Sequence, residues 1–168
     1  MVYQKAQNIF EDMIRQFALA GITLPLRQID TRLHFSRSST RLGSCKKDRG
    51  IYKISLSVYI LEDKEAVRST IAHELVHTCR GCMNHGTSFQ RIGRMVEAKL
   101  GIPVSSKASR EESERSGIKD AYIKKARYRI SCSNCDAVLY RQKKSALVMN
   151  PNRYRCGKCG GRLYVEVL

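Results

Sequence analysis

The segment His73-Glu74-Leu75-Val76-His77 is the feature that most restricts how this chain can fold. Apolar residues at positions 67, 71 and 75 recur every fourth residue, which predicts a helix over residues 63–79. Since each helical residue advances the chain by about 100°, the two histidines lie about 40° apart on one face and can reach one metal ion. Glu74 lies at the edge of that face. It is therefore placed to take a proton from water rather than to bind the metal.

A catalytic zinc site usually has three protein ligands and leaves a fourth position open. His85 follows His77 after seven residues and a short turn, so we expect it to be the third ligand. The metzincin pattern H-E-x-x-H-x-x-G-x-x-H is excluded, because its third histidine would fall on Met83. A gluzincin arrangement would use Glu97 instead and ranks second. The remaining histidine, His34, is expected to be an ordinary strand residue.

The rest of the first hundred residues alternates between helical and strand patterns. Apolar residues at helical spacing predict helices over residues 2–19 and 87–100. Alternating residues predict strands over 29–35, 42–45 and 51–56, with a turn at 46–50. We therefore expect an α+β domain over residues 1–104, with helices packed on a small antiparallel sheet.

A polar segment follows this domain. Residues 105–117 contain no apolar side chain larger than alanine, so they cannot bury a face. We place a linker at residues 105–125 and a second, small domain at residues 126–168.

Cysteine spacing predicts a second metal site in that small domain. Cys132 and Cys135 form one C-x-x-C pair, and Cys156 and Cys159 form another after twenty residues. Four thiolates close a tetrahedral shell, so this zinc is expected to be structural and the domain to be a small β zinc ribbon. Two redox pairs are the alternative, but the flanking β-α-β pattern is missing.

The positions of the other three cysteines are less specific for one function. Cys79 and Cys82 bracket a short turn between the predicted histidine ligands. They could form a redox-sensitive clip or an inhibitory zinc thiolate, but two small residues that stabilise a tight turn are favoured. Cys45 is expected to pack in the core.

The chain is strongly basic. It has 31 Lys and Arg residues against 15 Asp and Glu, a formal net charge of +16, which indicates a polyanionic partner such as nucleic acid. An anionic membrane surface is the other candidate, but no apolar run is long enough to span a bilayer. The N-terminal segment carries acidic residues where a signal peptide would be apolar, so we expect an intracellular protein in the cytoplasm, nucleoid or nucleus.

Much of this charge lies in the predicted ribbon, where tyrosines stand among the cations. Nine basic and two acidic residues occur in residues 126–168. Tyrosines between cations are typical of surfaces that stack on unpaired bases, although a solubilising surface with core tyrosines is the alternative. The expected nucleic-acid-binding residues are Arg127, Arg129, Tyr140, Arg141, Lys143, Lys144, Arg153, Tyr154, Arg155 and Lys158, with Tyr128 as a further possible platform.

The segment HELVHTCRGCMNHGTSF, preceded by RLGSCKKDRGIYKISLS, resembles the SprT-like family, which includes the Spartan DNA-protein crosslink proteases. The resemblance covers about residues 2–100, and SprT-like proteins often carry a C-terminal zinc ribbon. It implies that His73, His77 and His85 hold zinc and that Glu74 is catalytic.

We therefore expect a zincin-like protease domain followed by a zinc ribbon, with one catalytic and one structural Zn²⁺. The expected function is zinc-dependent endopeptidase activity on DNA-bound proteins, as in DNA-protein crosslink repair. The expected DNA partner is single-stranded or has unpaired regions. The alternative is a non-enzymatic nucleic-acid-binding zinc protein in which the histidine site is only structural.

Overall fold

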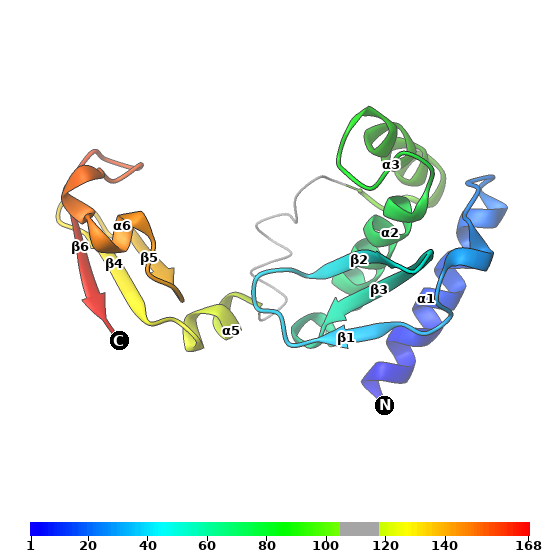
Figure 1. Cartoon of the computed structure of the whole chain (residues 1–168), viewed down its shortest axis with the longest axis horizontal. Helices are drawn as coiled ribbons and strands as arrows, with labels where there is room; N and C mark the ends of the chain where they lie inside the picture. Colours follow the sequence, from blue (N-terminus) through cyan, green and yellow to red (C-terminus); the bar gives the residue numbers. More distant parts are fainter. Residues whose placement is uncertain (105–117) are drawn as a thin grey trace. The chain divides into compact units, whose positions relative to one another are not determined.

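Helix α2 (Lys64–Thr78), which carries both motif histidines, is the central element of the N-terminal unit in the computed structural model (Figure 1). It contacts helices α1 and α3 and strands β2 and β3. The sequence predicts one buried face at Val67, Ile71 and Leu75, and these side chains are indeed buried. The helix is also buried on other sides, however, because neighbours pack around it. Its further buried side chains include Ala66, Thr70, Ala72, Val76 and Thr78.

Two amphipathic helices pack beside α2. Helix α1 (Val2–Leu19) has the predicted bounds and buries the side chains of Phe10 and Phe17 completely. Helix α3 (Thr87–Leu100) also has the predicted bounds. It ends at Gly101, which adopts the left-handed conformation (φ 66°) that glycine accommodates most easily.

The sheet of this unit is mixed rather than purely antiparallel as predicted. Its strand order is β1-β3-β2, with β1 (His34–Ser36), β2 (Gly43–Asp48) and β3 (Ile51–Ser57). The β2–β3 pair is antiparallel, but β1 pairs with β3 in parallel. The strand predicted over residues 29–35 is shorter, because the Asp30 carboxylate accepts a hydrogen bond from the Arg32 amide and bends the chain before His34.

The β2–β3 turn is tighter than predicted. Asp48 pairs with Ile51, so only Arg49 and Gly50 lie in the loop. Both have positive φ values, 47° and 84°, as a two-residue hairpin turn with the twist of the strands requires. As a result β2 extends three residues further than the sequence predicts.

The C-terminal unit is built on a second three-stranded sheet. Its strand order is β5-β4-β6, with β4 (Tyr128–Cys132), β5 (Val138–Arg141) and β6 (Leu163–Val167), and both pairs are antiparallel. The short helix α6 (Ala146–Met149) contributes Leu147 and Val148 to a core around Ile130, Cys156 and Leu163. The described residues of the two units also form three short 3-10 helices: η1 (Leu26–Gln28), η2 (Val58–Ile60) and η3 (Pro151–Arg153).

The structure describes residues 1–104 and 118–168, and its contacts divide the chain into Met1–Lys119 and Asp120–Leu168. Residues 105–117 of the predicted linker lie outside the described residues, and Ile118–Lys124 form helix α5. The mixed α+β class is confirmed. In the described part of the chain, no helix is long and apolar enough to cross a membrane.

Loss of the N-terminal cap of α2 should destabilise the N-terminal unit. The Asp63 carboxylate accepts hydrogen bonds from the Glu65 and Ala66 amides, both at 3.0 Å. Replacing such a cap by alanine costs about 1 kcal/mol, so Asp63→Ala should lower the urea midpoint of this unit, followed by circular dichroism. Asp63→Asn keeps an accepting oxygen and should retain most of the stability. Equal losses in both variants would contradict the capping role.

Candidate metal centres

Helix α2 places His73 and His77 on one face, one turn apart. Their Nε2 atoms lie 3.2 Å from each other. His77 is buried, while His73 is partly exposed, so the pair lies at the edge of the core with one side open to solvent. The helical spacing therefore produces the nitrogen pair that the motif predicts.

His85 joins this pair from the turn between α2 and α3. Its Nε2 lies 3.0 Å from the Nε2 of His73. Nitrogens at about 2.0–2.1 Å from a tetrahedral zinc ion would be about 3.3 Å apart, close to both observed distances. The three imidazoles thus fit one metal ion, and the exposed side of His85 leaves room for another ligand.

Phe89 packs against all three imidazoles. Its ring centroid lies 4.9 Å from that of His73, 4.6 Å from that of His77 and 4.7 Å from that of His85. The ring is buried and occupies the first turn of α3, four residues after His85. It therefore restricts the rotamers of all three histidines. The sequence shows Phe89 only as a member of the apolar stripe of this helix.

A hydrogen bond to a backbone carbonyl orients the His77 ring. Its Nδ1 donates a hydrogen bond to the Cys82 carbonyl at 2.7 Å, which leaves Nε2 unprotonated and directed at the other histidines. Burial lowers the pKa of His77, with the Cys82 bond acting in the opposite direction and the nearby His85 adding to the decrease. The neutral imidazole is the form that binds metals.

The turn that presents this carbonyl runs from Cys79 to Cys82. The Cys82 amide donates to the Cys79 carbonyl at 3.1 Å, and Gly81 between them has a φ of 75°, as the third position of a type II turn requires. Burial raises the pKa of Cys79 to about 11 and also raises the pKa of Cys82. Both thiols therefore stay protonated at neutral pH, which favours a role in the turn.

Glu74 follows His73 directly in sequence and faces strand β2. Its side chain is buried, and burial raises its pKa to about 7, while a hydrogen bond from the Cys45 amide acts in the opposite direction. Cys45 is partly buried beside it, and burial together with the Glu74 charge raises the pKa of that thiol to about 12. A buried carboxylate of this kind can accept a proton and return it at neutral pH.

Gly43 allows this close packing of α2 on β2. A Cβ atom at position 43 would lie 2.5 Å from Thr70 Cγ2 and 2.9 Å from Glu74 Oε1. Any side chain there would displace the carboxylate. No local sequence pattern indicates that position 43 must be glycine.

The four cysteines of the C-terminal unit also converge. The Sγ atoms of Cys132 and Cys159 lie 3.5 Å apart, those of Cys135 and Cys156 3.7 Å, and those of Cys135 and Cys159 3.4 Å. Sulfurs at about 2.3 Å from a tetrahedral zinc ion would be about 3.8 Å apart, so this group also fits one ion.

The backbone around these cysteines supports the same interpretation. The Lys158 and Cys159 amides hold the pKa of Cys156 at about 7, and the Asn134 amide lowers the pKa of Cys132. The Ala137 and Gly161 amides act in the same direction on Cys135 and Cys159, but neighbouring thiols and burial outweigh them and raise the pKa of both. A Cβ atom at Gly161 would lie 2.8 Å from Cys132 Sγ. The chain is therefore shaped around the thiols, as in a zinc knuckle.

The other predicted site residues lie apart from these groups. Among the described residues, Glu97 does not belong to either cluster of possible metal ligands. His34 is the first residue of strand β1, and its Nε2 lies 2.9 Å from Asp30 Oδ2.

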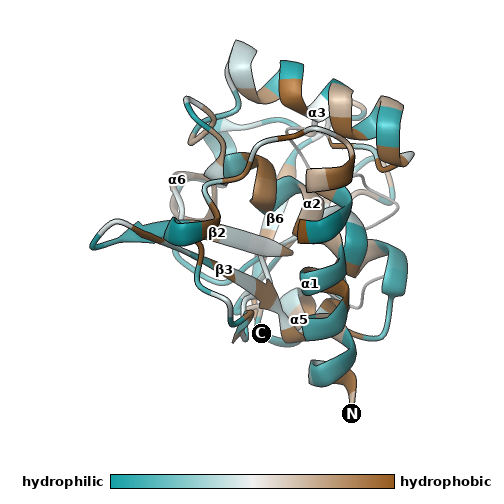
Figure 2. Ribbon diagram, turned by 90° about the vertical axis from the view of Figure 1, so that its right-hand side faces the viewer, coloured by the Kyte–Doolittle hydropathy of each residue, from teal (hydrophilic) through white to brown (hydrophobic). Residues whose placement is uncertain are grey.

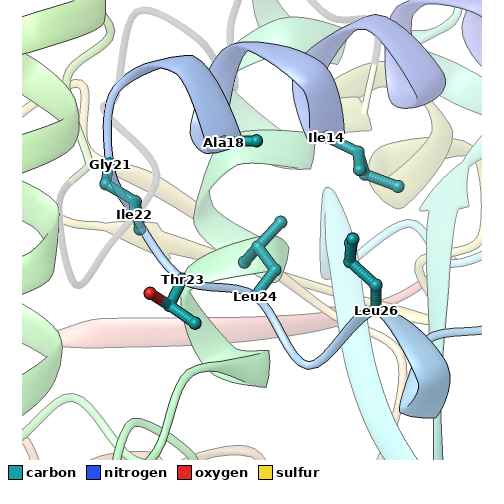
Figure 3. A pocket seen from close by; sticks show the side chains of 7 residues that line it. All are labelled: Ile14, Ala18, Gly21, Ile22, Thr23, Leu24 and Leu26. Atoms are coloured by element: carbon teal, nitrogen blue, oxygen red, sulfur yellow. The ribbon is translucent and has the colours of Figure 1, made fainter.

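A separate pocket at the end of α1 has a lining without titratable side chains (Figure 3). Its lining residues are Ile14, Ala18, Gly21, Ile22, Thr23, Leu24 and Leu26.

The predicted nucleic-acid-binding residues are distributed over several surfaces of the C-terminal unit. Arg129 and Tyr140 are opposite each other on one face of the sheet, whereas Arg141 is on the other face. Tyr164, which is 57% exposed and which the sequence prediction omits, shares the face of Arg129. The remaining members are exposed or half-exposed: Arg127, Lys143, Lys144, Arg153, Tyr154, Arg155 and Lys158.

Substitution of Gly81 should weaken metal binding at the histidines. Alanine at a φ of 75° strains the turn and shifts the Cys82 carbonyl away from His77. Loss of a hydrogen-bond partner on the second ring nitrogen of a ligating histidine lowers metal affinity by about tenfold or more. Competition for zinc with a coloured chelator would measure this change.

Gly50→Ala is the matched control, because Gly50 has a φ of 84° and a Cβ atom there would meet nothing within 4 Å. Similar stability loss with unchanged zinc affinity is expected there. Wild-type affinity in Gly81→Ala would show that the turn does not position His77.

Comparison with known proteins identifies the family of the chain. A search of curated proteins gives no match. The model of the SprT-like family, however, matches residues 6–108, which include α2, the histidine triad and α3. This match covers more than half of the chain. The chain therefore belongs to the SprT-like family.

Proposed function

We propose that this protein is a zinc-dependent endopeptidase that cleaves proteins bound to DNA. The observation that carries the proposal is the convergence of three imidazole nitrogens, together with the buried carboxylate of Glu74, which follows His73 directly in α2. Membership of the SprT-like family, whose members are metalloprotease-like, supports the same chemistry. His73, His77 and His85 would hold the catalytic ion, and the four cysteines a structural one.

When bound, zinc supplies Lewis acidity that polarises the scissile carbonyl and makes water a stronger acid. The chain's own residues supply the proton transfer and the rigidity. The Glu74 carboxylate accepts a proton from the attacking water and returns it to the leaving amine. Phe89 and the Cys82 carbonyl keep the imidazoles in place, and Gly43 leaves room for the carboxylate.

The DNA part of the proposal rests on charge and on the family resemblance. The chain has a formal net charge of +16, and the C-terminal unit exposes cations next to tyrosines. Arg129 and Tyr140 lie side by side across two strands, and Tyr164 is exposed on the same face. Arg129 is paired with Glu166 at 3.4 Å on this face, an exposed pair that a phosphate would compete with, and the tyrosines offer stacking on unpaired bases. DNA-protein crosslinks are the substrates that this combination would serve.

Glu74→Gln should abolish cleavage and leave the metal in place. The variant keeps every ligand but has no base, so peptide hydrolysis should fall by at least about a thousandfold while the zinc content stays unchanged. Two assays measure this loss: cleavage of a DNA-bound protein followed by gel electrophoresis, and cleavage of a free fluorogenic peptide.

His85→Ala and Glu97→Ala complete that experiment. We expect His85→Ala to lose zinc and activity, and Glu97→Ala to retain both. The reverse result would make Glu97 the third ligand. A wild-type protein that binds zinc and DNA but cleaves neither substrate would instead be a non-enzymatic nucleic-acid-binding protein.

Chelation should separate the two metal sites. Three imidazoles with an open position hold zinc less tightly than four thiolates, so a mild chelator should remove the histidine-bound ion first. Elemental analysis should find two zinc ions per chain before treatment and one afterwards, with peptidase activity lost at this stage. A single ion in the freshly purified full chain would contradict the two-site proposal.

A further inference from the structure

The sheet region of the N-terminal unit carries nearly all of that unit's net charge. Residues 1–104 contain sixteen basic and nine acidic residues, and residues 27–53 alone contain eight basic and two acidic ones. Every one of these eight cations is exposed or half-buried. They are Arg27, Arg32, Arg37, Arg41, Lys46, Lys47, Arg49 and Lys53.

The sheet has one buried face and one open face. Tyr52, Ile54 and Leu56 of β3 point into the core, and α2 packs on that side against β2 and β3. The alternate residues form the opposite face, which we call the outer face. It comprises His34 and Ser36 of β1, Ser44, Lys46 and Asp48 of β2, and Ile51, Lys53 and Ser55 of β3. All of these are exposed or half-exposed. Ser57, which lies opposite Ser36 at the end of β3, is buried and donates a hydrogen bond to the Ser38 carbonyl, so it is not counted in the outer face. The outer face contains no Phe, Tyr or Trp.

Two lysines on the outer face are placed directly opposite each other. Lys46 pairs with Lys53 in the β2–β3 register, an arrangement in which like charges repel. Lys53 Nζ donates to Asp48 Oδ2 at 2.8 Å, which neutralises one of the two. Arg49 adds another cation at the exposed turn, and Figure 2 shows the hydrophilic end of this hairpin projecting from the unit. A polyanion on this face would relieve the remaining repulsion.

We propose that the outer face and the tip of the β2–β3 hairpin bind the sugar-phosphate backbone of nucleic acid. The proposal rests on the DNA partner of the proposed function and adds a second contact surface, on the N-terminal unit. Lysine, arginine and serine side chains often bind phosphate groups of nucleic acid. Contacts of this kind do not depend on the base sequence. The absence of Phe, Tyr and Trp from the outer face distinguishes it from the tyrosine-bearing face of β4, β5 and β6. Ile51 alone offers an apolar side chain for insertion into a membrane, so nucleic acid is favoured over a lipid surface.

The test compares two charge reversals of equal size in the full chain. Lys46→Glu with Arg49→Glu alters the outer face and hairpin tip, whereas Lys5→Glu with Arg94→Glu alters exposed positions on α1 and α3. Affinity for a mixed-sequence duplex oligonucleotide is measured by fluorescence anisotropy over a range of salt concentrations. We expect the hairpin variant to bind about tenfold more weakly, with a salt dependence reduced by about two phosphate contacts, and the control to change much less.

Three results would overturn this assignment. Equal losses in both variants would show an effect of net charge alone, and unchanged affinity in the hairpin variant would show that the face does not touch DNA. A greater loss of binding to phosphatidylserine vesicles than to DNA would make it a membrane surface. Lys46→Gln with Arg49→Gln, checked by circular dichroism, excludes misfolding as the cause, because the neutral pair should give a smaller loss in the same direction.

Free-peptide cleavage separates this inference from the proposed function. The hairpin variant should cleave a free peptide at the wild-type rate, because neither residue belongs to the histidine site. A wild-type protein that binds DNA through this face but cleaves no peptide would refute the peptidase and leave the inference standing. A wild-type protein that binds no DNA would refute both the DNA part of the function and this surface.

Discussion

The close packing of α2 on strand β2 is the constraint on which the histidine site depends. A Cβ atom at position 43 would overlap side-chain atoms of Thr70 and Glu74, so glycine is what allows these side chains of the helix to lie so close to the strand. This approach buries the Glu74 carboxylate and brings it to the Cys45 amide. Burial then keeps the carboxylate oriented and makes it a stronger base than an exposed glutamate, while the adjacent histidines stay at the edge of the core. The proposed base and two of the three candidate metal ligands, His73 and His77, thus share one helix.

The C-terminal unit has a much smaller hydrophobic core than the N-terminal unit. Its described residues include only four buried apolar ones, Ala121, Ile130, Cys156 and Leu163, and the last three form a cluster with a few partly buried neighbours. So small a core supplies little hydrophobic free energy, and the convergent thiols are placed so that they could hold a metal ion, which would stabilise the unit further. Two glycines allow the chain to pack around the thiols. Gly160 adopts a positive φ, and Gly161 leaves room for Cys132 Sγ. The N-terminal unit, by contrast, has an extensive core of its own.

Local patterns predicted α1, α2 and α3 well and the first sheet only in part, and they did not predict the short helices α5 and α6. The bounds of α1 and α3 follow from apolar spacing and from the glycines that end each helix, both of which are properties of short segments. The parallel pairing of β1 with β3 joins residues about twenty positions apart, and no local pattern specifies it. The two-residue turn was missed because Arg49 adopts a positive φ, which is uncommon for arginine. The extra buried positions of α2 arise because neighbours pack around it.

The sequence by itself determined the pairs within the two candidate metal groups, but not that His85 rather than Glu97 completes the histidine group. Helical periodicity places His73 and His77 on one face, and the two C-x-x-C pairs form two knuckles, because these spacings act over a few residues. Only the tertiary structure decided what surrounds them: Phe89 against the imidazoles, the Cys82 carbonyl on His77, and Gly43 beside Glu74. It also decided which lysines share the outer face of the first sheet. These contacts depend on how separate elements pack, and packing is set by the whole core rather than by any one segment.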